Sequence, residues 1–106
     1  MAVSTKFQVQ KQPWEILKGV GIDFVARLAT GEVLDSGETQ EVVADINGVP
    51  VAGIVSEVQI SAVTSTVLLC TVSAGINGQK IRLTYKAIGT LGNHLEGEVW
   101  IKVKET

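Results

Sequence analysis

Residues 80–103 read KIRLTYKAIGTLGNHLEGEVWIKV, and this stretch decides the fold. Apolar and small residues recur in it at every second position: Ile81, Leu83, Tyr85 and Ala87, then Leu95, Gly97, Val99, Ile101 and Val103. A period of two places one face of a strand in a core and the other face in water. Residues 80–87 and 95–103 are therefore predicted to be strands, separated by a turn at Gly92-Asn93.

The same pattern extends outward across the chain. Residues 20–28 alternate clearly, and residues 7–12, 39–46, 54–60 and 65–73 are further strand candidates. Alternation with a solvated outer face is typical of antiparallel sheets. About seven short strands in a chain of this length predict an immunoglobulin-like antiparallel β-sandwich, with a small β-barrel as the alternative. We expect one such domain spanning residues 1–106.

Proline and glycine mark the breaks between these segments. Pro13 separates the first strand candidate from a short continuation at residues 15–18, because proline cannot donate into a central ladder. Asn47-Gly48 suits a two-residue hairpin turn, and Pro50 argues for an edge or a loop directly after it.

Composition supports strands and argues against several partners. The 106 residues are 45% hydrophobic and carry a formal net charge of −2, and Val, Ile and Thr make up about a third of them. Branched side chains pack well on a pleated surface. Lysines and arginines are scattered among acids rather than gathered into a basic face, so no nucleic-acid partner is expected. No stretch approaches the roughly 20 apolar residues that span a bilayer, so no membrane partner is expected either.

The residue types that usually carry chemistry occur here without their customary partners. Cys70 is the single cysteine and lies in an apolar run, which predicts a small buried side chain. His94 is the single histidine and is predicted to be an exposed turn residue. It could share a strand face with Glu96 and Glu98, but a metal site needs further ligands. The acids of residues 31–41 are predicted to lie in a solvated loop. We expect no enzyme, no metal and no cofactor.

Aromatic residues are the candidate interaction sites. Trp100 should share its strand face with Glu98 and Lys102, where it is either covered by a loop or long side chains, or free to anchor another subunit. Trp14 could plug the end of the sandwich or contact a partner. Tyr85 is expected in the core, with its hydroxyl reaching a backbone group. Asp23, on an outer face, is expected to pair with a lysine or arginine.

The order of these elements resembles a group of small phage and prophage virion-associated proteins with an immunoglobulin-like, fibronectin type III-like, sandwich. The residues that carry the resemblance are Lys11, Pro13 and Glu15, then Ile22-Asp23-Phe24, Leu28 with Gly31-Glu32, Gly75-Ile76-Asn77-Gly78, and Thr90 with Gly92. They cover nearly the whole chain and consist mostly of turn residues. Ile81 stands where that group favours an aromatic residue.

This resemblance implies a non-enzymatic structural protein of a phage or prophage particle, in the tail, neck or head. It would act through contacts with itself or with other virion proteins, as a possible homo-oligomer, and Trp100 and Trp14 are its candidate partner-binding residues. Such a protein would be made in the cytoplasm of a bacterial host and carried into the virion. The alternative function is a carbohydrate-binding sandwich, in which exposed aromatic rings stack on sugars.

Overall fold

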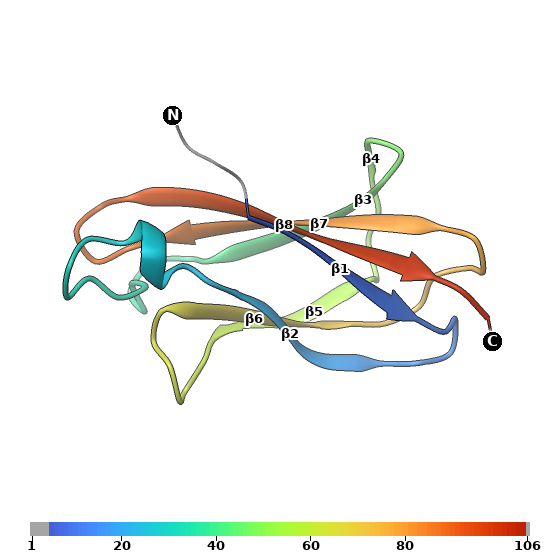
Figure 1. Cartoon of the computed structure of the whole chain (residues 1–106), viewed down its shortest axis with the longest axis horizontal. Coiled ribbons are helices and arrows are strands. Elements are labelled where there is room, and N and C mark those ends of the chain that lie inside the picture. Colours follow the sequence, from blue (N-terminus) through green and yellow to red (C-terminus); the bar gives the residue numbers. More distant parts are fainter. Residues whose placement is uncertain (1–4, 106) are drawn as a thin grey trace.

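The chain folds into two β-sheets packed over a shared apolar core (Figure 1). The computed structural model describes residues 5–105, with side chains from residue 9 onward. Its elements are β1 (Thr5–Lys11), β2 (Leu17–Asp23), the 3-10 turn η1 (Val25–Arg27), β3 (Glu41–Ile46), β4 (Val49–Pro50), β5 (Val55–Ile60), β6 (Val67–Val72), β7 (Lys80–Ile88) and β8 (His94–Val103). One sheet has the order β1-β8-β7-β3-β4 and the other β2-β6-β5.

The predicted all-β class is confirmed, and the two sheets are compatible with a sandwich. The structure has eight strands rather than the seven predicted, because the chain pairs again directly after Asn47-Gly48. Both turn residues have positive φ, 53° and 81°, as a type I′ hairpin turn requires. The returning strand β4 is only two residues long, and Pro50 lies at the edge of the sheet, where its missing N–H breaks no ladder.

Strand direction is where the antiparallel prediction was wrong. β1 runs parallel to β8, in an unbroken register from Thr5 opposite Gly97 to Lys11 opposite Val103. The other strand pairs are antiparallel. Alternation identifies the buried face of a strand but carries no information on its direction. After β1 the chain crosses to the other sheet rather than forming a hairpin, and this crossing leaves β1 parallel to its neighbour (Figure 1).

The strand predicted for residues 20–28 ends early, at Asp23. The Asp23 carboxylate accepts hydrogen bonds from the Val25 backbone N–H at 3.0 Å and from Thr66 Oγ1 at 2.8 Å, so it does not form the expected pair with a lysine or arginine. A carboxylate that binds the backbone two residues on favours a turn over extended chain. The turn η1 follows, which keeps Phe24 buried and leaves Val25 exposed.

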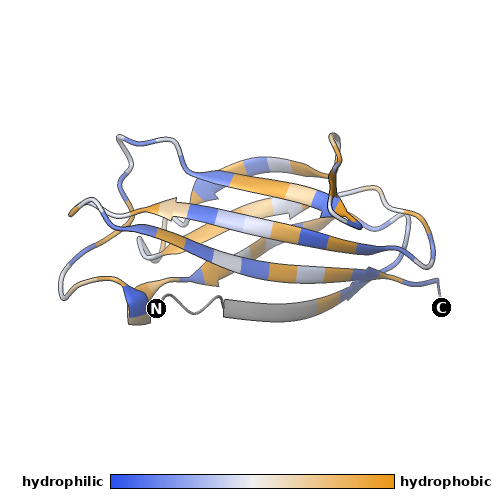
Figure 2. Ribbon diagram, turned by 90° about the horizontal axis from the view of Figure 1, so that it is seen from above, coloured by the Kyte–Doolittle hydropathy of each residue, from blue (hydrophilic) through white to orange (hydrophobic). Residues whose placement is uncertain are grey.

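The core is made by inward side chains of both sheets, and hydrophobic and hydrophilic residues alternate along the ribbons (Figure 2). Tyr85 is fully buried and its hydroxyl donates to the Val20 carbonyl at 2.7 Å, as predicted. Cys70 is buried against it, with Sγ 3.3 Å from the Tyr85 hydroxyl. Burial raises the pKa of both groups, so the thiol and the phenol are kept neutral.

Candidate functional site

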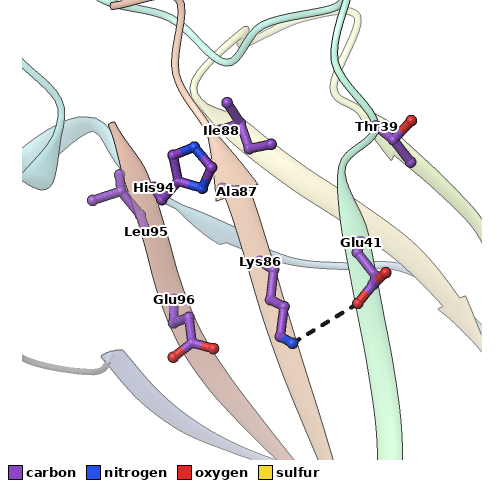
Figure 3. A pocket seen from close by; sticks show the side chains of 8 residues that line it. All are labelled: Thr39, Glu41, Lys86, Ala87, Ile88, His94, Leu95 and Glu96. Atoms are coloured by element: carbon purple, nitrogen blue, oxygen red, sulfur yellow. Dashed lines mark ion pairs between the residues drawn. The ribbon is translucent and has the colours of Figure 1, made fainter. Parts of the chain in front are cut away.

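The single histidine lies beside a shallow hollow of about 480 Å³ on the outer face of the larger sheet (Figure 3). Lys86 lies between Glu41, whose Oε1 is 4.0 Å from its Nζ, and Glu96, its cross-strand partner on β8. Both side chains of the Lys86–Glu41 pair are more than half exposed, so this pair contributes little to stability. His94 is exposed, as predicted, at the start of β8.

No hydrogen bond joins the His94 imidazole to another described side chain. From residue 9 to residue 105, no three His, Cys, Asp or Glu side chains are grouped in a way that could hold a metal ion. Within the described residues, no helix is long and apolar enough to cross a membrane. Exposed charged side chains of Glu41, Lys86 and Glu96 thus line the hollow beside the His94 ring.

Trp100 lies on the same outer face, one strand in from the edge of the sheet. Its indole Nε1 donates to Glu98 Oε2 at 3.1 Å, and its ring is half buried. The cross-strand neighbour of Trp100 is Arg82, whose Nε donates to Asp45 Oδ2 at 2.8 Å. The hydrogen bond and charge of Asp45 raise the pKa of Arg82. Trp100 thus belongs to a row of polar and charged side chains across three strands.

Trp14 lies on a different surface, the turn between β1 and β2 at one end of the sandwich. Its side chain is 82% exposed, so it does not plug this end. The turn beneath it is closed by two hydrogen bonds, from the Gln12 N–H to Glu15 Oε1 at 2.6 Å and from the Glu15 N–H to the Gln12 carbonyl at 3.1 Å. The structure therefore does not join Trp14 and Trp100 into one patch.

The buried Lys11 side chain stabilises the Trp14 turn through hydrogen bonds to backbone carbonyls. The sequence analysis did not predict this role. The residue is 0% exposed, and its ammonium donates to the carbonyls of Gln12 at 2.8 Å, Pro13 at 3.1 Å and Ala74 at 2.6 Å. Burial lowers the pKa of Lys11. The alternation of the strand could have predicted its burial, since Lys11 follows Val9 by two residues and so points to the same, inward face. We name these contacts, together with the two bonds that close the turn, the Lys11 clamp.

Glu32 has the corresponding position at the opposite end, and here the prediction of a solvated acid was wrong. The residue is 4% exposed. Its carboxylate accepts hydrogen bonds from the Ala29 N–H at 2.9 Å, the Leu91 N–H at 2.9 Å and Asn93 Nδ2 at 2.6 Å. These bonds lower the pKa of Glu32, the Ala29 bond most of all. The carboxylate packs over Gly89, where any Cβ would collide with it.

The two surfaces differ in what they expose. The Lys11 clamp fixes a turn with an exposed aromatic ring, whereas the hollow beside His94 is lined by exposed charged side chains together with Ala87, Ile88 and Leu95. No family model matches the chain, and neither a curated protein nor a solved structure matches it significantly.

Proposed function

We propose that this protein is a non-enzymatic assembly protein, a structural component of a phage or prophage particle, that acts through protein–protein contacts. The observation that carries the proposal is Trp14, a tryptophan with an 82% exposed side chain on a turn fixed by the Lys11 clamp. Tryptophan is enriched among the residues that dominate binding energy at interfaces. A turn ordered before binding loses less conformational entropy when it meets a partner.

Topology supports the immunoglobulin-like architecture that we propose for this module. The order β2-β6-β5 corresponds to strands B, E and D of an immunoglobulin sandwich, and β8-β7-β3 corresponds to strands G, F and C. Such sandwiches present loops at both ends of a rigid core. The Trp14 turn is one of these end loops.

Further apolar side chains extend the surface around Trp14. Ile16 is 62% exposed two residues beyond Trp14. Ile76 is 68% exposed on the loop whose Ala74 carbonyl binds Lys11. An exposed aromatic with aliphatic neighbours fits an apolar recess on another protein. We propose that this end of the sandwich docks against a neighbouring subunit of the particle.

The proposal is tested by binding of the purified full chain to purified products of the genes that flank its own, with head, neck and tail proteins as the first probes. We expect one of them to bind, and Trp14→Ala to weaken that binding at least about tenfold. Leu91→Ala is the matched control, because Leu91 is also a large exposed apolar residue but lies at the opposite end. It should bind as the wild type does.

Two results would contradict the proposal. Unchanged affinity in Trp14→Ala would contradict the proposal that Trp14 contacts the partner. Failure of every flanking gene product to bind would contradict the proposal that the protein belongs to a phage or prophage particle. A glycan array that the wild type binds and Trp14→Ala does not would favour the carbohydrate-binding alternative. Among the side chains described, Trp14 has the only exposed aromatic ring, so a platform of several stacked rings is not formed.

A further inference from the structure

The two sheets have four edge strands, and three of them are interrupted. β4 is two residues long and contains Pro50. β2 has a register shift against β6 after Leu17, at Gly19 with φ 72°, and β5 has one after Ser56, at Glu57 with φ 51°. Short strands, prolines and bulges are among the features that keep sheet edges from pairing with other chains, as are charged residues such as lysine.

The fourth edge, β1, is not short and has neither a proline nor a bulge, and its charged residues are Lys6 and Lys11. Its seven residues keep one register with β8 throughout. The Lys11 carbonyl accepts the Lys104 N–H at 2.8 Å, so the backbone groups of Lys11 face β8. Successive residues of a strand direct these groups to opposite sides. The N–H and C=O groups of Lys6, Gln8 and Gln10 are therefore directed toward the open edge.

An apolar groove lies beside this edge, between the two sheets. It has a volume of about 500 Å³, and its lining includes Val9 of β1, Val99 of β8, and Leu17 and Val20 of β2. Lys18, Gly19 and Gly21 complete the wall on the β2 side. A strand added to β1 would place every second residue over this groove.

We propose that a second copy of this chain is the added strand, with the two β1 strands antiparallel about a two-fold axis at Gln8. In this register Gln8 meets Gln8 of the second copy, and Lys6 meets Gln10 in both directions. These are the residues with open backbone groups, so each of the three pairs exchanges two hydrogen bonds. A shift of the register by one residue would oppose open groups with groups already bonded to β8.

Charge and polarity favour a second copy as the occupant. Lys6 is the only charged residue among the three with open groups, and the two-fold register sets it against Gln10 rather than against another lysine. Within its own sheet, Lys6 is paired in register with Glu98. On the groove side, the register opposes residue 7 of the second copy to Val9, which lines the groove. An isologous contact of this kind closes as a dimer.

Two substitutions of identical chemistry have opposite expected effects on this dimer. Gln8→Glu sets two carboxylates against each other at the axis, whereas Gln10→Glu sets a carboxylate against Lys6 of the second copy. We expect Gln8→Glu to raise the dimer dissociation constant roughly three- to tenfold, and Gln10→Glu to lower it by a similar factor. Sedimentation equilibrium of the full chain over a concentration series measures both. Circular dichroism shows that both variants are folded.

The opposite signs make the experiment decisive. Added salt should bring the two variants closer together, because it screens both charge pairs. A wild-type chain that remains monomeric across the series would overturn the inference, as would a dimer on which both variants act in the same direction. Trp14 lies past the last paired residue of β1, so Trp14→Ala should leave this equilibrium unchanged. The dimer can therefore be disproved while the proposed function stands, and the proposed function can be disproved while the dimer stands.

Discussion

The two ends of the sandwich are each held by one buried charged side chain, of opposite sign. At one end the Lys11 ammonium donates to three backbone carbonyls. At the other the Glu32 carboxylate accepts from two backbone N–H groups and one side-chain amide. Loops leave carbonyls and amides without strand partners, and a buried group must be satisfied by something. One long side chain binds three loop carbonyls at the Lys11 end, and at the Glu32 end one binds two loop N–H groups and a side-chain amide.

The two ends differ in the side chain that each ordered loop exposes to solvent. Glu32 joins two loops to each other, and the large side chain exposed on them is the aliphatic Leu91 rather than an aromatic ring. Lys11 orders a turn whose central side chain, Trp14, is directed into solvent. A buried ionic contact at a loop is thus compatible with either an aliphatic or an aromatic side chain exposed above it. The exposed residue above the contact distinguishes the two.

Among substitutions at the two ends, the largest effect is expected at Lys11. Lys11→Met keeps the unbranched stem but removes the ammonium. This leaves the Pro13 and Ala74 carbonyls without their donor and the Gln12 carbonyl with the Glu15 N–H alone. We expect a loss of about 3 kcal/mol in the free energy of unfolding, measured as a lower urea midpoint with an unchanged slope. Lys18→Met is the matched control, since the Lys18 side chain is 75% exposed and makes only a 3.9 Å ion pair with Glu57.

The control should change the free energy of unfolding by less than about 0.5 kcal/mol. Equal losses in the two variants would show that the Lys11 contacts contribute no more than a surface lysine does. The two ends would then differ in their energetics as well as in the sign of their charge.

The second effect is a pH dependence at the Glu32 end. Because the folded-state pKa of Glu32 lies below its ordinary value of 4.5, its charge stabilises the fold above that value. This contribution is lost as the pH falls through the lowered pKa. Glu32→Gln should therefore be less stable than the wild type at neutral pH, and the gap should narrow below pH 4.5. Thermal melts across this range measure it.

Glu38→Gln changes an exposed acid of the same loop and serves as the control. Its stability should follow that of the wild type at every pH. A gap for Glu32→Gln that stays constant with pH would mean that the ionised carboxylate is not what holds this end.

The smallest effect on stability concerns the presenting residue itself. Trp14→Ala removes the ring of a residue that is 82% exposed, so the free energy of unfolding should stay within about 0.5 kcal/mol of the wild-type value. Phe24→Ala, which truncates a fully buried ring, should instead cost about 3–5 kcal/mol. A marked loss of stability in Trp14→Ala would make that end a structural contact rather than a presented one.

Periodicity predicted the parts of the fold where local pattern and burial coincide. Residues 80–87 and 95–103 fall within β7 and β8, and the phase of Tyr85 placed it in the core. The same phase placed Trp100 on the outer face, beside Glu98. In each case one strand contains the whole signal, so no knowledge of distant residues was needed.

The features that the sequence did not predict depend on long-range contacts. Glu32 is buried because Leu91 and Asn93, some sixty positions away, donate to it. The direction of β1 depends on the crossing between sheets, and the end of β2 depends partly on Thr66. Lys11 shared the inward phase of Val9, but a lysine is expected inside only where acceptors surround it. Two of its three acceptors are local, and the third comes from Ala74.

The buried contact between Cys70 and Tyr85 makes the labelling rate of the thiol a measure of how fast the two sheets separate. The chain's single thiol is 2% exposed between the two sheets, and its proton is retained by burial. A disulfide reagent can attack it only after the layers part, because the thiolate is the reactive form and needs access. When the reagent is in large excess, the labelling rate therefore equals the opening rate of the sandwich. That rate is obtained without denaturant, and from a side chain that the sequence already carries.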